Sequence, residues 1–117
     1  MLLLLTNWAK VPCYAINDTL TYVELHKTTT DPKLIHRAPN RNPLILECLL
    51  FMDTITIVSN QTKEITIVLT NMTTGTVDTY SYIVDDNGVS MPLYDNGDYE
   101  IMVSCGTDVY VGEFCVE

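Results

Sequence analysis

The segment that most constrains the fold is the seven-residue stretch Asp95–Ile101, which reads Asp-Asn-Gly-Asp-Tyr-Glu-Ile. Asp and Asn favour tight turns because a side-chain oxygen can close the turn, and Gly97 can adopt a positive φ. Tyr99 would then open a strand and return its hydroxyl to the backbone of the turn. This device is the tyrosine corner of β-sandwich domains. The motif therefore predicts a sandwich in which the Tyr99 ring is buried where a strand begins.

The rest of the second half of the chain predicts strands at short, regular spacing, which is typical of a sandwich. Residues 44–52 are apolar on both faces apart from Glu47, so a short helix competes there, but their length favours a strand. Gly75 is placed for a bulged hairpin, and Pro92 marks its strand as an edge strand. The expected strands are 44–52, 54–57, 65–70, 76–84, 89–93, 99–105 and 109–116. About seven strands predict an all-β fold, an immunoglobulin-like antiparallel β-sandwich over residues 44–117.

Residues 16–43 differ from this domain. They are polar and contain three prolines, so they predict an extended N-terminal segment with one short strand at residues 20–25. The segment holds both histidines and four of the six basic residues, namely His26, His36, Lys27, Lys33, Arg37 and Arg41. This basic segment either lies against the acidic sheet or meets an acidic partner.

The first fifteen residues admit a short signal peptide, with four leucines near the start and a small-residue cleavage site after Ala15. The apolar run is short and no basic residue precedes it, so an ordinary N-terminus is the alternative. Export predicts a secreted, periplasmic or cell-surface protein. No stretch approaches the length of apolar residues that a membrane span needs, and we expect none.

Fifteen acidic residues stand against six basic ones, which gives a net charge of −9. This balance argues against a nucleic-acid partner, because phosphate binding needs clustered Lys and Arg. The sequence contains no nucleophile, phosphate-loop or zinc-protease motif, and His26 and His36 lie too far apart to predict a metal site alone. The acidic turns at 85–87 and 95–98 lack the spacing of a calcium loop. We therefore expect no catalytic residue, no metal and no cofactor.

Four cysteines, Cys13, Cys48, Cys105 and Cys115, allow three pairings in an oxidising compartment. A two-residue turn at Gly106-Thr107 would set Cys105 opposite Asp108, so that Cys105 and Cys115 lie on opposite faces of the sheet. The predicted register therefore excludes a bridge between these two. Loss of Cys13 with a signal peptide would leave one thiol unpaired.

The C-terminal motifs resemble a known family. Gly75-Thr76-Val77 with Tyr80 forms one hairpin motif, Met91-Pro92-Leu93 precedes Asn96–Ile101, and Tyr110–Phe114 closes the chain. This pattern, across roughly residues 20–117, resembles the small secreted Bacteroides proteins of the domain of unknown function 3244 family. The resemblance implies an immunoglobulin-like sandwich in the periplasm or at the cell surface, and it brings no known catalytic residues.

We therefore expect a non-enzymatic, exported or cell-surface module that binds an unknown protein partner through its loops or by strand addition. The alternative is a carbohydrate-binding module in which exposed tyrosines stack on sugar rings. The tyrosines in question are Tyr80, Tyr82, Tyr94 and Tyr110. Two Asp-Thr-apolar triplets, at Asp18-Thr19 and Asp53-Thr54, match the pattern that Bacteroides O-glycosylates on exported proteins. The oligomeric state has no signal in the sequence.

Overall fold

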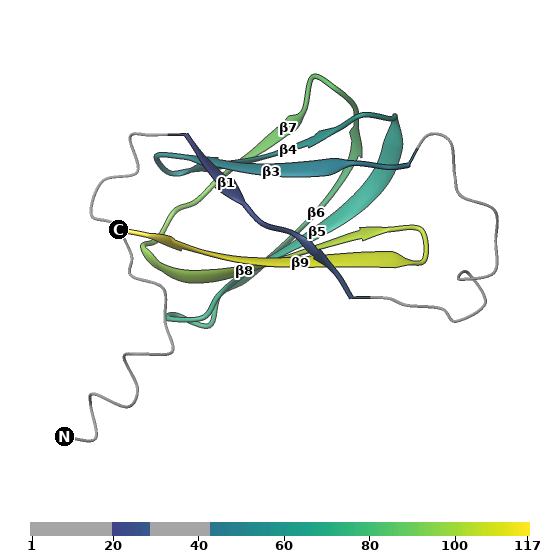
Figure 1. Cartoon of the computed structure of the whole chain (residues 1–117). Coiled ribbons are helices and arrows are strands. Elements are labelled where there is room, and N and C mark those ends of the chain that lie inside the picture. The colour runs from purple at the N-terminus through teal and green to yellow at the C-terminus, as the bar shows by residue number, and fades with distance from the viewer. Residues whose placement is uncertain (1–19, 29–42) are drawn as a thin grey trace.

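A computed structural model describes residues 20–28 and 43–117, and within them every regular element is a strand. Two antiparallel sheets face each other (Figure 1). One has four strands in the order β1-β3-β4-β7, and the other has five in the order β2-β9-β8-β5-β6. The strands are β1 Thr21–Val23, β2 His26–Lys27, β3 Leu46–Phe51, β4 Thr54–Ser59, β5 Lys63–Asn71, β6 Val77–Val84, β7 Val89–Pro92, β8 Gly97–Cys105 and β9 Asp108–Val116.

This architecture confirms the predicted fold class, an immunoglobulin-like sandwich. All seven strands expected after residue 44 are present as β3 to β9, and the helical alternative for residues 44–52 is wrong. The last hairpin has the predicted register, with Val103 opposite Tyr110 and Cys105 opposite Asp108. None of the described elements is a helix long and apolar enough to cross a membrane.

The N-terminal segment departs from the prediction, because the single strand expected at 20–25 is two short strands in different sheets. β1 pairs with β3, and β2 pairs with β9, so the chain crosses from one sheet to the other at Glu24 and Leu25. Gly112 permits this crossing. A Cβ at that position would lie 2.7 Å from the carbonyl oxygen of Glu24 and 3.0 Å from the Leu25 side chain. The alternation pattern carried no information on this close approach. The described sandwich therefore has nine strands, the seven expected over residues 44–117 and two in place of the single N-terminal one.

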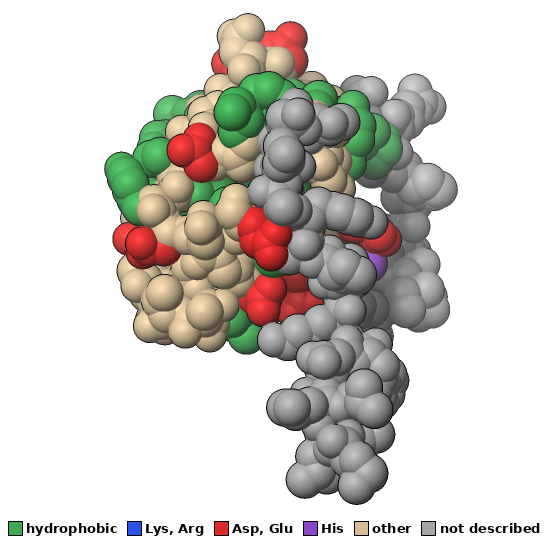
Figure 2. Space-filling view, turned by 90° about the vertical axis from the view of Figure 1, so that its left-hand side faces the viewer, with side chains coloured by type: hydrophobic (Ala, Val, Ile, Leu, Met, Phe, Trp, Pro, Cys, Tyr) green, Lys and Arg blue, Asp and Glu red, His purple; other side chains and the backbone are tan. Residues whose placement is uncertain are grey.

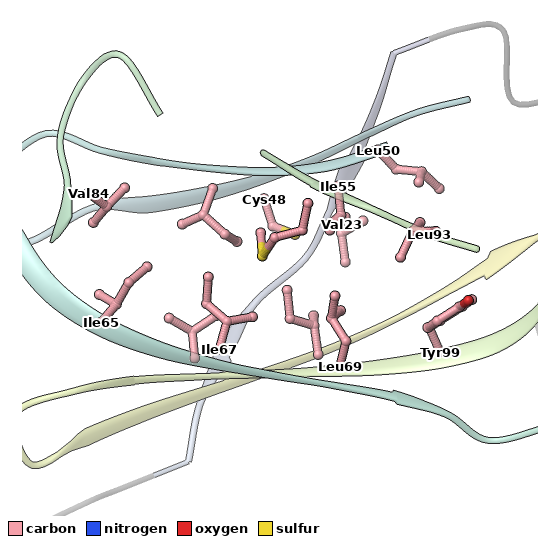
Figure 3. Close-up of a cluster of buried hydrophobic side chains, with 14 of the residues drawn as sticks. Val23, Cys48, Leu50, Ile55, Ile65, Ile67, Leu69, Val84, Leu93 and Tyr99 are labelled. Atoms are coloured by element: carbon pink, nitrogen blue, oxygen red, sulfur yellow. The ribbon is translucent and has the colours of Figure 1, made fainter. Parts of the chain in front are cut away.

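The core lies between the two sheets (Figure 3). It exists because β4, β5 and β8 alternate buried side chains, most of them apolar, with side chains that are partly or fully exposed, the pattern of strands with one face inward. Each apolar side chain that is fully buried contributes about 1.5–3 kcal/mol to folding. The buried apolar residues are Val23, Cys48, Leu50, Ile55, Ile57, Ile65, Ile67, Leu69, Val84, Met91, Leu93, Tyr99, Ile101, Val103 and Val116.

A polar corner, defined here as Asn71, Thr73 and Asp95–Tyr99, joins the β5–β6 turn to the start of β8. The Tyr99 hydroxyl donates a hydrogen bond to the carbonyl oxygen of Asp95 at 2.5 Å, and its ring is buried and stacked on Phe114. Gly97 has a φ of 136°. The hydroxyl contact and the positive φ are those that the sequence motif predicted.

The polar corner is closed by two residues that the motif did not include. Asn71 is 2% exposed, and its amide donates to the carbonyl oxygen of Asn96 at 3.1 Å. Its side-chain oxygen accepts from the backbone N–H groups of Thr73 and Thr74. The Thr73 hydroxyl accepts from the N–H of Asp98 at 3.1 Å. Side chains from a neighbouring turn therefore fix a turn that Asp95 and Asn96 were expected to close.

The cysteines follow the predicted register. Cys48 is a free thiol buried in the core, and Cys105 is a free, half-buried thiol. Cys115 is disulfide-bonded, with its partner outside the described residues. The predictions for residues 1–15, for Asp18-Thr19, for His36 and for most of the basic segment fall outside the described residues.

Candidate functional site

The least protected element of the described sandwich is β6, which pairs with β5 on one side only. It has eight residues, no proline and a single charged side chain, Asp78. Its side chains are exposed on both faces over most of its length, and Val77 and Ile83 are 57% and 64% exposed. A long edge strand of this kind presents a row of unpaired backbone groups. We refer to residues 77–84 as the β6 edge.

The other three edges are short or interrupted. β1 has three residues and β2 has two. β7 has four residues and ends in Pro92, whose position at an edge the sequence predicted. Short strands and proline are devices by which proteins block edge-to-edge pairing. The contrast singles out the β6 edge among the four.

A row of tyrosines lies on the inner face of the β6 edge. Tyr80 and Tyr82 are opposite Ile67 and Ile65 of β5, and their rings stack with centroids 6.0 Å apart at an angle of 12°. Partial burial raises the pKa of Tyr80, and the negative charges of the nearby Asp78 carboxylate and of the Tyr94 and Tyr82 hydroxyls, once ionised, raise it further. Tyr94 is 79% exposed. Three of the four tyrosines considered for sugar binding therefore lie close together.

Tyr110, the fourth, lies elsewhere. It stands on β9 opposite Val103, packs against the core and is paired with Lys27 of β2 in register. It cannot share a ligand with the row on β6, because β8 and β5 separate the two strands.

A small cleft opens beside the tyrosine row, with a volume of about 130 Å³. One wall is formed by Leu69 of β5, Asp78 of β6 and Thr76 of the turn between these strands. The other is formed by the end of β7 and the chain after it, through Pro92 to Asp95. Asp78 and Asp95 face this space, so it is acidic as well as aromatic. A cleft of this size holds a side chain or part of one sugar ring.

The surface of the sandwich is strongly acidic. Within the described residues, Lys27 and Lys63 are the only Lys or Arg side chains, and Lys27 is paired with Asp108 at 3.5 Å. On the face shown in Figure 2, acidic side chains are spread over the described surface, and none of the described side chains in view is Lys or Arg. The bases that balance part of this charge stand in the sequence at residues 29–42, outside the described part.

The other polar residues considered in the sequence do not form a site within the described residues. Within residues 20–28 and 43–117, no group of three or more His, Cys, Asp or Glu is placed to hold a metal ion. His26 is exposed, with its imidazole 3.7 Å from Glu24. Asp85 accepts a hydrogen bond from the N–H of Asn87, which is ordinary turn chemistry. Asp53 is exposed and Thr54 is half-buried at the β3–β4 turn, and their glycosylation stays a prediction.

Sequence reasoning identified the tyrosines but missed Asp78 and the edge position of β6. The absence of proline and of lysine from residues 77–84 was a signal for an unprotected edge. The alternation of side chains along these residues did not reveal the edge, because a central strand shows the same alternation.

Two sheets in this order, with antiparallel neighbours and a core between them, define an immunoglobulin-like β-sandwich. Among solved structures, the chain is similar to the crystal structure of a DUF3244 family protein from Bacteroides vulgatus, described as an immunoglobulin-like β-sandwich. The TM-score is 0.60 and the identity is 15%, over 85% of this chain and 100% of the other. No family model and no curated protein matches the chain. The neighbour belongs to the family that the C-terminal motifs resemble.

Proposed function

We propose that the protein is a non-enzymatic, exported or cell-surface module that binds a protein partner on the β6 side of the sandwich. The observation that carries this proposal is the unprotected β6 edge, eight residues long, beside exposed tyrosines. Proteins usually block such edges, and some domains that leave one open bind an extended peptide there by strand addition. Folds of this class host many activities, so the proposal rests on the edge and not on the fold.

Export is supported by the resemblance of the C-terminal motifs to a family of secreted proteins. N-terminal sequencing and subcellular fractionation of the native protein test this part. Recovery in the cytoplasmic fraction with every thiol reduced would contradict it.

The binding role is tested by chemical cross-linking in intact cells, followed by purification of the full chain under denaturing conditions. We expect one partner, recovered in saturable amounts, with cross-links that map to residues near β6. Untagged protein added in excess should compete for the same partner. Cross-links spread evenly over the surface, or none above background, would contradict the proposal.

Carbohydrate binding is the second candidate function, and the grouping of Tyr80, Tyr82 and Tyr94 favours it. Aromatic side chains stack on sugar rings, and acidic groups such as Asp78 and Asp95 can accept hydrogen bonds from sugar hydroxyls. The cleft between them provides the concave surface that such a site needs.

A glycan array separates the two candidates. If the second is correct, binding to a defined glycan disappears in Tyr94→Ala and persists in Tyr22→Ala, which removes a different exposed tyrosine, on β1. If the array detects no glycan, even among ligands with millimolar dissociation constants, protein binding remains the explanation of the exposed tyrosines.

A further inference from the structure

The chemistry of the partner can be read from the two faces of the β6 edge, given the proposed binding role. We infer that β6 accepts an extended segment of a partner protein as an additional strand, and that this segment alternates basic with aliphatic side chains. Three features of β6 support this mode of binding: free backbone groups, an aliphatic outer row and an acidic, aromatic inner row.

The hydrogen bond from the N–H of Asn71 to the carbonyl oxygen of Thr76, 2.8 Å long, determines which backbone groups of β6 are free. Antiparallel strands alternate between residues that bond to the neighbour and residues that point away from it. Counting from this bond along the paired register, every second residue of β6 points away from β5. These residues are Val77, Thr79, Ser81 and Ile83. An added strand would satisfy their N–H and carbonyl groups.

The same four residues place their side chains on the outer face of the five-stranded sheet. They stand opposite Glu64, Thr66, Val68 and Thr70 of β5. Val77 and Ile83, at the two ends of the row, are the exposed aliphatic groups. Aliphatic side chains on an added strand would cover them, and cross-strand contacts of this kind contribute about 0.2–1 kcal/mol each. One face of the partner segment is therefore aliphatic.

The inner face has different chemistry, with Asp78, Tyr80 and Tyr82 in a row. A Lys or Arg on the added strand would lie beside the Asp78 carboxylate and over the faces of stacked tyrosines, where a cation–π contact is favourable. Asp95 lines the adjoining cleft and adds negative charge. Because side chains of a strand alternate between faces, the partner must alternate basic with aliphatic residues.

Charge also selects against a second copy of this chain as the occupant. Pairing of β6 with β6 would bring together two chains that each carry a net charge of −9. Asp78, the only charged side chain of β6, would then face a second β6 strand that contains no Lys or Arg. Repulsion of this kind opposes self-association, whereas it steers a basic segment toward the edge.

The test uses three synthetic peptides of equal length and the purified full chain labelled with ¹⁵N. The first peptide alternates Val with Arg, the second alternates Val with Glu, and the third has the composition of the first with all Arg residues at one end. We expect the first alone to bind, with amide shifts that concentrate on residues 77–84. Hydrogen exchange at the amides of Thr79, Ser81 and Ile83 should slow at least tenfold on binding, because these N–H groups gain partners.

Two variants separate strand addition from attraction by charge alone. Ser81→Pro removes an outward N–H and none of the bonds to β5, and should weaken the first peptide about tenfold. Asp78→Asn should weaken it a few-fold, whereas Asp86→Asn, in the exposed turn after β6, should have little effect. Thr79→Lys adds a positive charge to the edge and should weaken the first peptide as well. A copy of the first peptide in which every second backbone N–H is methylated keeps its charge but cannot pair as a strand, and it replaces Ser81→Pro if that variant does not fold.

The inference is overturned if the Val–Arg and segregated peptides bind alike, if Ser81→Pro and Thr79→Lys both retain full affinity, or if the shifts lie elsewhere. Concentration-dependent dimerisation of the chain that is lost in Thr79→Lys would also overturn it, in favour of self-pairing. These failures are distinct from failure of the proposed function. If a partner cross-links near β6 but binds Ser81→Pro and Thr79→Lys as well as the wild type, the proposed binding role stands and strand addition is ruled out.

Discussion

The polar corner and the β6 edge meet at the β5–β6 turn, yet they are built in opposite ways. At the polar corner, Asn71 satisfies three backbone groups and Thr73 a fourth, so that a single arrangement is specified. Along the β6 edge, the outward backbone groups have no partner among the described residues. Hydrogen bonds to the backbone are thus concentrated where two turns must be held together, and the strand beside them has none from the described part of the chain on its outer side. Substitutions should therefore have large effects on stability at the corner and small ones at the edge.

The largest effect is expected for Gly97→Ala. A Cβ at this position would lie 2.8 Å from the Thr73 hydroxyl oxygen and 2.9 Å from the Asn71 side-chain oxygen, at a φ of 136° that other residues avoid. We expect a loss of about 3–4 kcal/mol in the free energy of unfolding, from strain and from broken hydrogen bonds. A urea denaturation curve, monitored by far-UV circular dichroism, measures this loss.

Gly75→Ala is the matched control, because Gly75 also has a positive φ but nothing lies within 4 Å of the added Cβ. Backbone strain alone should cost about 1–2 kcal/mol there. Equal losses in the two variants would mean that the contacts of the polar corner contribute nothing beyond conformation.

Asn71→Ala should follow, with a loss of about 2–3 kcal/mol. It removes a buried side chain and leaves the carbonyl of Asn96 and two N–H groups, all in part-buried hydrogen bonds, without their partner, and an unsatisfied group of this kind costs about 1–3 kcal/mol. Asn60→Ala is the control. Asn60 also makes two backbone contacts, to Ile45 and Pro43, but water can replace them because the residue is exposed. A loss at Asn60 as large as that at Asn71 would contradict the role of burial.

Tyr99→Phe should cost about 1–1.5 kcal/mol, because it removes the hydroxyl contact to Asp95 and keeps the ring stacked on Phe114. Thermal unfolding of the variant beside Tyr94→Phe checks this. Tyr94 is exposed, so its hydroxyl can bond to water, and we expect no change in the midpoint there. A Tyr99→Phe variant as stable as the wild type would mean that the hydroxyl does not fix the corner.

The sequence predicted the structure where a turn or strand depends only on residues that are adjacent in the chain. A turn that needs Gly97 at a positive φ and a strand that alternates along its length both leave their signature in a few adjacent residues. Asn71 and Gly112 were missed because each acts on a segment far away in the sequence, the first on Asn96 and the second on Glu24. Read locally, Asn71-Met72-Thr73 looks like a glycosylation triplet, whereas the side chain is buried and holds a turn. The candidate site was missed in part for the same reason, since edge position is a property of the whole sheet.

The buried thiol of Cys48, on β3, predicts how the stability of the fold depends on pH. Burial raises the pKa of the Cys48 thiol to about 12, from 9.0 in an exposed chain. Below pH 9 the thiol is protonated in both folded and unfolded chains, so its contribution to stability is complete. Between pH 9 and 12 only the unfolded chain releases the proton, and the free energy of unfolding falls by up to about 1.4 kcal/mol per pH unit.

The measurement compares urea midpoints at pH 8 and pH 10 for the wild type and for Cys48→Ala. The variant should be less stable at pH 8 but should lose less stability on going to pH 10, by about 1 kcal/mol. Tyrosine and lysine titrations are common to both proteins and cancel in the difference. Identical slopes would show that Cys48 does not titrate on unfolding in this range.

The smallest effect on stability is expected at the β6 edge itself, where Thr79→Lys should change the free energy of unfolding by less than about 0.5 kcal/mol. Its side chain is exposed on the outer face and its outward backbone groups are unpaired, so nothing in the described sandwich depends on it. Val68→Lys, one strand further in and directly opposite Thr79, is the matched control, because Val68 is half-buried between β6 and β8. That variant should lose about 1–2 kcal/mol. If Thr79→Lys proved as destabilising as Val68→Lys, the strand would be held by contacts on its outer side, and the edge would not be open to a partner. A silent Thr79→Lys that also blocks strand addition would separate binding from folding within a single residue, which is the property expected of an edge kept open for a partner.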